Sequence, residues 1–163
     1  MMDQPSSEEN KATRLPSLGE IGLQQFVPYL MNRIIGRYNA SLRDEMATLG
    51  LTTPKMRALA VLSVTDGILI WQLAVYAVVE QSTLSRALDA LELDALIRRE
   101  SDPEDSRAVR VFITDSGRAA FDRLWPHMAK SYDQMLEAID EDERRAFVGT
   151  LQKILSNIRK HDF

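Results

Sequence analysis

The chain of 163 residues contains no cysteine, which excludes disulfides, thiolate metal sites, cysteine nucleophiles and thiol-based redox sensing. No apolar run approaches the roughly 20 residues that a transmembrane helix needs. The polar start MMDQPSSEENKATRLPS also lacks the apolar core of a secretory signal. We therefore expect a cytoplasmic protein without membrane contact. His127 and His161 stand alone without metal-ligand spacing, so no metal site is predicted.

Motifs typical of enzymes are also missing. The sequence has no glycine-rich phosphate loop, no HExxH and no GxSxG, and the acidic run from Asp140 to Glu143 fits a helix start better than a catalytic site. We predict that the chain is not an enzyme and needs no cofactor. A net charge of −4 gives no indication of nucleic-acid binding, while a hydrophobic fraction of 45% is enough for a core.

The periodicity of apolar residues divides the chain into a tail and one domain. Residues 1–18 show no periodicity and predict a flexible N-terminal tail, and residues 19–163 predict a single domain. The domain is expected to be mainly α-helical with a small β-hairpin. In chain order the expected elements are helices at 21–49, from Thr53 to Asp66, at 71–78 and at 81–95, a short strand at 68–70, hairpin strands at 96–100 and 109–113, a long helix from Thr114 to Leu136 and a last helix after Asp140.

The helices at 71–78 and 81–95 have the lengths and separation of a helix-turn-helix. On the second helix an apolar stripe faces a polar side: the stripe is Leu84, Leu88, Leu91 and Ala95, and the polar side holds Ser82, Ser85, Arg86 and Asp89. Small polar side chains let a backbone approach the bases of the major groove, and an arginine can bind guanine through two hydrogen bonds. The competing interpretation is an amphipathic helix with a solvated face.

The hairpin favours the DNA-binding interpretation, because a hairpin after a recognition helix is the wing of a winged helix. Arg107, in the loop SDPEDSRA, is suited to a narrow minor groove, and Asp105 can brace its guanidinium. Arg99 and Arg110 on the wing strands are expected to meet phosphates. The alternative is a solvated hairpin whose ion pairs contribute little.

The segment EQSTLSRALDALELDALIRRESDPEDSRAVRVFITDSGR resembles the MarR (multiple-antibiotic-resistance regulator) family of winged helix-turn-helix transcription regulators. The polar start of the recognition helix, the Asp-x-Arg pair at Asp105 and Arg107, and Thr114 with Gly117 carry the resemblance. It implies a DNA-reading module at 67–117 and dimerisation helices at 21–49 and 118–160. The implied DNA contacts are Gln81, Ser82, Thr83, Ser85, Arg86, Arg99, Asp105, Arg107 and Arg110.

The sequence departs from this family at its turns and in its charge. Val78 and Ala95 stand where the family usually has glycine, so we expect these two turns to be built differently. The module 67–117 holds five arginines, no lysine and nine acids, a net charge of −4. Because cations that contact phosphate supply much of DNA affinity, we expect weak non-specific binding and a steep dependence on DNA sequence.

The resemblance further implies a homodimer that reads a palindromic operator, and a small, often aromatic, ligand that releases the DNA. The apolar stripe of the last helix suits a partner chain, the alternative being an intramolecular core. Candidate ligand-lining residues are Phe26, Tyr29, Tyr38, Trp71 and Trp125, although the residues by themselves favour a core role for each. We expect a repressor; the alternative is a winged-helix interaction protein that has lost DNA binding.

Overall fold

The computed structural model describes residues 14–161, which fall into two compact units, one that ends at Arg37 and one that begins at Tyr38. Most of the predicted tail, residues 1–13, lies outside the described part. Helix α1 (Leu18–Ile21) begins before the predicted start of the first helix, because Ser17 and Glu20 form a reciprocal capping box. The second unit holds nearly all of the buried apolar side chains.

The single helix predicted at 21–49 is wrong, since the chain breaks there several times. A 3-10 turn η1 (Leu23–Gln25) follows Gly22, whose φ of 80° is accessible to glycine. Helix α2 (Val27–Ser41) then begins with proline as its second residue, and α3 (Arg43–Thr48) is separate from it. Neither α1 nor α2 contains a buried residue, although the apolar spacing of α2 is helical.

Three helices whose apolar stripes meet contribute a large part of the core of the second unit. They are α4 (Thr53–Val64), α5 (Ile70–Ala77) and α6 (Gln81–Leu93). Thr52, rather than the predicted Thr53, is the N-cap residue of α4. The stripe predicted on α6 is confirmed for Leu84, Leu88 and Leu91, which are fully buried, whereas Ala95 lies beyond the helix and is exposed.

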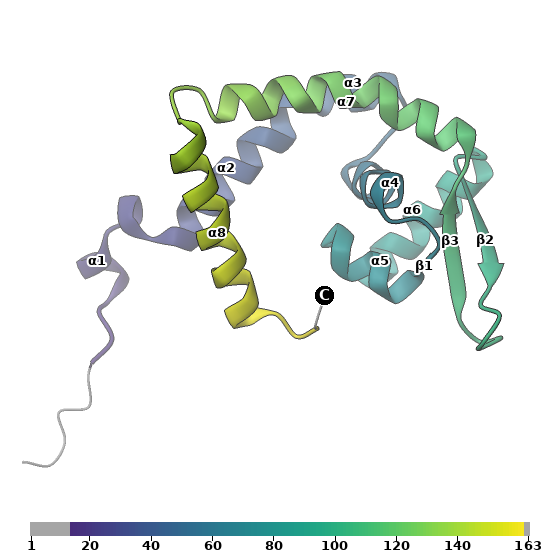
Figure 1. Cartoon of the computed structure of the whole chain (residues 1–163), viewed down its shortest axis with the longest axis horizontal. Helices are drawn as coiled ribbons and strands as arrows, with labels where there is room; N and C mark the ends of the chain where they lie inside the picture. The colour runs from purple at the N-terminus through teal and green to yellow at the C-terminus, as the bar shows by residue number, and fades with distance from the viewer. Residues whose placement is uncertain (1–13, 162–163) are drawn as a thin grey trace, which may run out of the picture. The chain divides into compact units, whose positions relative to one another are not determined.

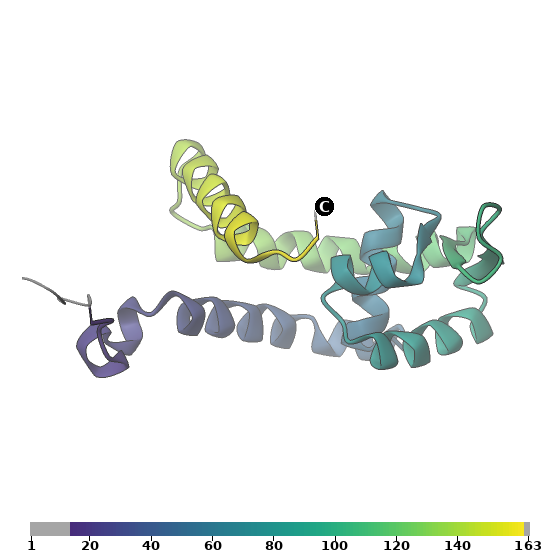
Figure 2. The same ribbon diagram turned by 90° about the horizontal axis from the view of Figure 1, so that it is seen from below.

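A three-stranded antiparallel sheet lies beside these helices. Strands β2 (Ile97–Ser101) and β3 (Val109–Ile113) form the predicted hairpin, with Ile97 opposite Ile113 and Ser101 opposite Val109. The short strand β1 (Ile68–Leu69) pairs with the other edge of β3, so the strand order is β1-β3-β2. The hairpin connects the end of α6 with the start of α7 (Figures 1 and 2).

Two long helices complete the second unit. Helix α7 (Asp115–Met135) starts at Thr114, whose Oγ1 accepts a hydrogen bond from the Gly117 amide at 3.0 Å. Helix α8 (Glu141–Ile158) is capped by Asp140 and contains no buried residue. Its apolar face is therefore not an intramolecular core in the single chain. Within the described residues, no helix is long and apolar enough to cross a membrane, and no cluster of His, Asp or Glu is arranged to hold a metal ion.

The two turns without glycine are left-handed, which corrects the expectation that they are built differently. Val78 has φ 52° and Ala95 has φ 56°. Each follows a helix, and the amide after it donates back into the last turn: Val79 to the Ala74 carbonyl at 3.1 Å, and Leu96 to the Leu91 carbonyl at 2.9 Å. These hydrogen bonds satisfy helix-end carbonyls in the usual way of a left-handed helix cap. The packing of the elements on either side of each turn outweighs the conformational cost of placing a residue with a Cβ in the left-handed region.

Candidate DNA-binding site

The first half of α6 presents a polar surface whose side chains form no hydrogen bond or ion pair with the rest of residues 14–161. The five DNA contacts predicted on this helix are all exposed: Gln81, Ser82, Thr83, Ser85 and Arg86, of which Ser82, Ser85 and Arg86 are predicted to read bases. Within residues 14–161 none of their side chains has a hydrogen-bond or ion-pair partner. Because the opposite face of α6 is anchored by fully buried leucines, the orientation of this polar face is determined by the core.

The wing loop is organised by Asp102, a residue that the sequence analysis did not single out. Its side chain is 6% exposed. One oxygen, Oδ1, accepts the amides of Glu104 at 2.8 Å and Asp105 at 3.0 Å. The other, Oδ2, accepts Nε of Arg110 at 2.5 Å. Hydrogen bonds from the Glu104 amide, then from the Asp105 amide and Arg110, hold the pKa of Asp102 below its ordinary value against burial.

The Asp-x-Arg pair at the wing tip is a local brace around one oxygen. Oδ1 of Asp105 accepts the Arg107 amide at 3.0 Å and its Nε at 3.3 Å. The guanidinium therefore meets one carboxylate oxygen rather than the two of a fork. The Arg107 side chain is 91% exposed, so its remaining donors face solvent. This arrangement keeps a cation at the tip of the wing without burying it.

Two of the predicted wing contacts, Arg99 and Arg110, are joined to other elements or turns of the module. Arg110 donates to Asp102 and, through Nη1, to the Gly67 carbonyl at 2.8 Å, which joins β3 to the turn before β1. Arg99 donates to Glu92 and lies 2.9 Å from Asp89, both on α6. That these two arginines meet phosphates stays a prediction; in the single chain their guanidinium groups already donate to intramolecular acceptors.

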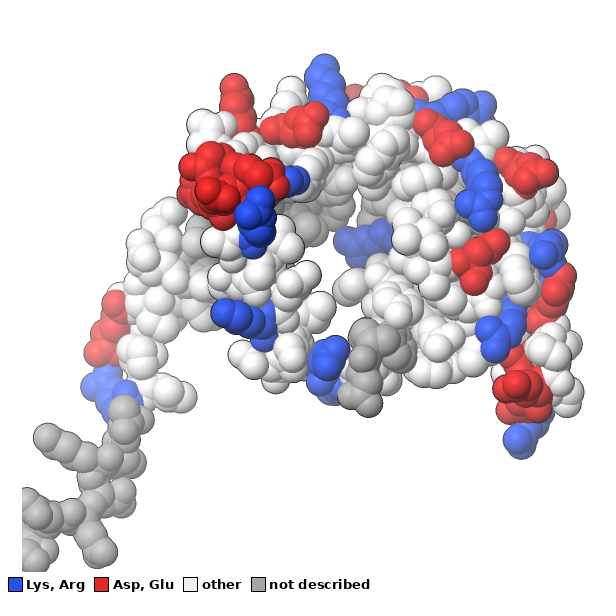
Figure 3. Space-filling view, in the orientation of Figure 1, with Lys and Arg blue, Asp and Glu red and all other residues white. Residues whose placement is uncertain are grey.

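Six of the nine acids of the module take part in ion pairs: Asp89, Glu92, Asp94, Glu100, Asp102 and Asp105. Lys55, which lies outside 67–117, is 3.3 Å from Asp94, and Arg98 pairs with Glu100 on the same strand. The view in Figure 3 shows basic and acidic side chains interspersed along the hairpin, with no continuous basic face. Arg86 is the arginine of the module that has no ionic partner among residues 14–161.

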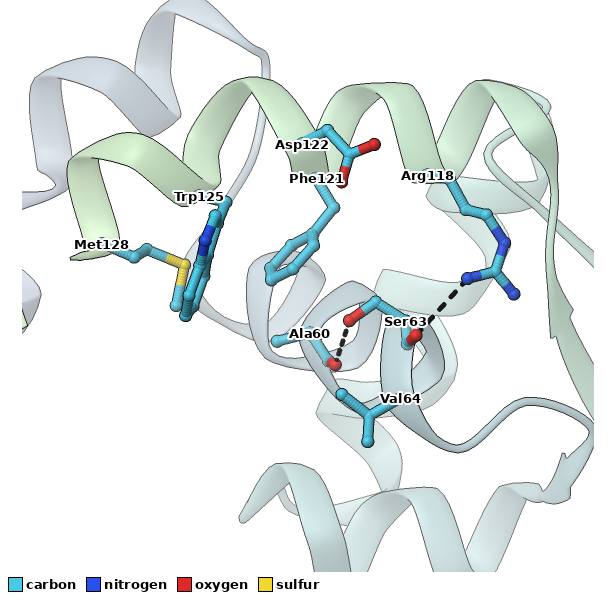
Figure 4. Close-up of a pocket in the computed structure, with 8 residues that line it drawn as sticks. All are labelled: Ala60, Ser63, Val64, Arg118, Phe121, Asp122, Trp125 and Met128. Atoms are coloured by element: carbon cyan, nitrogen blue, oxygen red, sulfur yellow. Dashed lines mark hydrogen bonds between the residues drawn. The ribbon is translucent and has the colours of Figure 1, made fainter.

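A pocket of about 460 Å³ opens between α4 and α7 (Figure 4). Its walls are mostly apolar and aromatic, and its lining residues are Ala60, Ser63, Val64, Arg118, Phe121, Asp122, Trp125 and Met128. In the close-up the rings of Phe121 and Trp125 project from α7 toward α4. Arg118 donates weakly to the Ser63 carbonyl and to Asp66, each at 3.4 Å, so its charge is only loosely held.

Of the five predicted ligand-lining residues, Trp125 lines this pocket. Phe26 and Tyr29 belong to the first unit, and Tyr38 packs against the core of the second. The Trp71 ring lies 5.9 Å from that of His161, away from the lining set. Sequence reasoning missed Phe121 and Arg118, although their spacing of four and seven from Trp125 places all three on one face of a helix.

Comparison with known proteins agrees with this geometry. The model of the MarR family matches residues 49–108, from the end of α3 into the wing loop. A crystal structure of a MarR-family transcriptional regulator from Silicibacter pomeroyi is 59% identical, with a TM-score of 0.86, and the match covers 91% of this chain and 100% of that one.

Two more distant relatives extend the comparison. The HTH-type transcriptional repressor IacR of Pseudomonas putida is 22% identical over 143 residues, which is 88% of this chain and 86% of IacR. BpsR of Bordetella bronchiseptica, whose DNA binding is regulated by 6-hydroxynicotinic acid, shares the fold at a TM-score of 0.68 and 23% identity, over 78% of this chain and 97% of BpsR. The fold is that of transcription regulators rather than of enzymes, and the chain belongs to the MarR family of transcriptional regulators.

Proposed function

We propose that the chain binds a palindromic DNA operator in the cytoplasm as a homodimer, represses transcription there, and releases the DNA when a small aromatic ligand binds. The observation that carries this proposal is the exposed, unpartnered polar face of α6 next to a wing that holds Arg107 in solvent. A solvated surface helix does not need such a wing. The similarity to the repressor IacR supports the direction of regulation.

Each exposed residue has a role that follows from its size and charge. Ser82 and Ser85 are short enough to let the backbone of α6 approach base edges, and Arg86 reaches the O6 and N7 atoms of a guanine. Arg107 enters the adjacent minor groove, where a narrow groove concentrates negative potential. Because Arg99 and Arg110 are engaged internally, few cations remain for phosphates, and the affinity for random DNA is low.

Selection of bound sequences from a random DNA pool tests the reading residues. We expect a palindrome whose half-site centres are about 34 Å apart. Replacing Arg86 by alanine relaxes the preference at one base pair per half-site and weakens binding about 10- to 100-fold. The matched control is Arg123→Ala, which removes the same charge from an exposed position on α7. If Arg86→Ala and Arg123→Ala lose the same amount of DNA affinity, the interaction protein is favoured instead. The same conclusion follows if Arg107→Ala keeps the wild-type affinity.

The apolar face of α8 supports the homodimer. Phe147, Leu155 and Ile158 are 47%, 61% and 71% exposed in the single chain, which is costly for side chains of this size on a soluble protein. A second chain that covers this face buries them and places two reading modules on one DNA. Sedimentation equilibrium at micromolar concentration is expected to give the mass of two chains, and the mass of one chain contradicts the proposal.

The pocket between α4 and α7 is the proposed effector site. Aromatic walls suit a planar ring, and the loosely held Arg118 suits a carboxylate on that ring. The regulation of BpsR by 6-hydroxynicotinic acid makes this compound a suitable first probe. The chain has two tryptophans. We expect the probe to quench the fluorescence of Trp71→Phe, which keeps Trp125, but not that of Trp125→Phe; quenching in the reverse pattern contradicts this location.

A further inference from the structure

The guanidinium of Arg99 joins the wing to the recognition helix. Its Nε and Nη2 donate to Oε2 of Glu92 at 2.9 and 2.5 Å, and Nη2 also lies 2.9 Å from Oδ1 of Asp89. The other oxygen of Glu92 accepts the backbone amide of Arg99 at 3.1 Å. Glu92 therefore holds both the main chain and the side chain of β2, and a second carboxylate one turn earlier on α6 completes the contact.

This contact differs from the exposed ion pairs of the wing. The Arg99 side chain is 26% exposed, and its hydrogen bonds with Glu92 raise the pKa of Arg99 and lower the pKa of Glu92. Charge-assisted hydrogen bonds in partly buried positions fix geometry better than surface pairs do. The neighbouring Arg98 is 52% exposed, lies over the Phe112 ring of β3 and pairs within its own strand, so these contacts stay inside the hairpin.

The contact lies where the hairpin leaves the helical core. Five registered residue pairs join β2 to β3, and β3 also pairs with β1, so the hairpin is held through β1 on one side and through the chain between Asp94 and Ile97 on the other. Arg99 ties β2 back to α6 just beyond that point. A rotation of the base of β2 relative to α6 would break the hydrogen bonds between Arg99 and Glu92.

We infer that Arg99 is a positioning residue for DNA reading: with Glu92 and Asp89 it sets the direction of the wing relative to α6, and thereby the distance between Arg86 and Arg107, without touching DNA itself. This inference rests on the proposed DNA binding. The inference gives the acids in the second half of the recognition helix a role, which is to hold the wing. Their charge by itself repels the phosphates of DNA.

The first test compares Arg99→Gln with Arg98→Gln, which removes the same charge from the next residue of β2. Arg99→Gln is expected to weaken binding to the selected operator about tenfold, in the middle of the range for coupled residues. The slope of log affinity against log salt stays unchanged, because no phosphate contact is lost. A decrease of about 0.9 in that slope identifies Arg99 as a phosphate contact and overturns the inference.

The second test uses Glu92→Ala, for which charge and positioning predict opposite signs. Removing an acid from a DNA-facing helix strengthens binding if only charge matters. It weakens binding if Glu92 holds the wing. In the same series, Arg107→Ala is expected to cost less affinity in the Arg99→Gln background than in the wild type, because a displaced wing no longer places Arg107 in the minor groove. Additive losses, or tighter binding by Glu92→Ala, overturn the inference.

Thermal melting of each variant separates positioning from folding, with binding measured well below the melting temperature. If Arg99→Gln does not fold, Arg99→Lys carries the test, because lysine keeps the charge but cannot form two directed hydrogen bonds to Glu92. Wild-type affinity retained by Arg99→Lys then overturns the inference. If the wild type binds the operator and the Arg99 variants bind it with the same affinity, this inference alone is overturned. Absence of operator binding by the wild type contradicts the proposed function and the inference together.

Discussion

Replacing Ala95 by glycine is expected to stabilise the protein. Ala95 has φ 56° and an exposed side chain, so its methyl group contributes no burial in return for the left-handed backbone. An L-residue other than glycine pays roughly 1–2 kcal/mol for this conformation. Glycine gives back about 0.4–1 kcal/mol through the greater freedom of the unfolded chain. The expected net gain in unfolding free energy is about 0.5–1 kcal/mol.

The matched control is Ala119→Gly, the same chemical change at an exposed position inside α7. There the backbone is right-handed, so glycine brings only its entropy cost and lowers the stability by about 0.5–1 kcal/mol. For a chain of this size the two variants are expected to shift the melting temperature by about 1–4 °C in opposite directions.

Thermal unfolding followed by circular dichroism, at one fixed protomer concentration, measures both variants, since the melting temperature of a dimer depends on concentration. Urea titration supplies the free energies, and an unchanged slope shows that the denatured state is not altered. If Ala95→Gly lowers stability as much as Ala119→Gly does, the turn is not left-handed in solution and the account of both glycine-free turns is refuted.

Three other predictions follow from single contacts. A Cβ on Gly117 would lie 2.0 Å from the Leu96 carbonyl oxygen, so Gly117→Ala is expected to lower the unfolding free energy by about 1–3 kcal/mol, measured by urea titration. Leu155→Asp on the apolar face of α8 is expected to give monomers in sedimentation, whereas Ser156→Asp is expected to leave the dimer mass unchanged. If Leu155→Asp also remains a dimer, α8 is not the interface. Because hydrogen bonds lower the pKa of folded Asp102, its stabilisation is present above the unfolded value of about 4 and is lost as pH falls through the folded pKa. The stability deficit of Asp102→Asn is therefore expected to shrink below about pH 4, and a constant deficit in pH-dependent urea midpoints contradicts this.

Local patterns were sufficient to predict most of the second unit. The leucine stripe of α6, the hairpin and the capped start of α7 depend on residues within a few positions of one another, where helical or strand periodicity is decisive. The first helix failed for a local reason as well. Apolar spacing continued through Gly22 and Phe26, but spacing does not record where the backbone leaves the helix.

The roles of the charged residues could not be predicted in the same way. Arg99, Arg107 and Arg110 are all arginines in or beside the wing strands, and the sequence alone assigned all three to DNA. Only the tertiary structure separates them, because a guanidinium takes the partner that the fold brings near. Arg110 meets the Gly67 carbonyl 43 positions away, and Arg99 meets Glu92 across the turn at Ala95.

For this protein, then, the sequence by itself determined the winged helix-turn-helix and the polar face of α6, since both follow from the periodic burial of apolar side chains. The tertiary structure decided which cations remain available to DNA and that two turns adopt left-handed backbones without glycine. The physical reason is that ion pairs and turn strain are settled by contacts between elements, where packing energy outweighs the preference of any single residue.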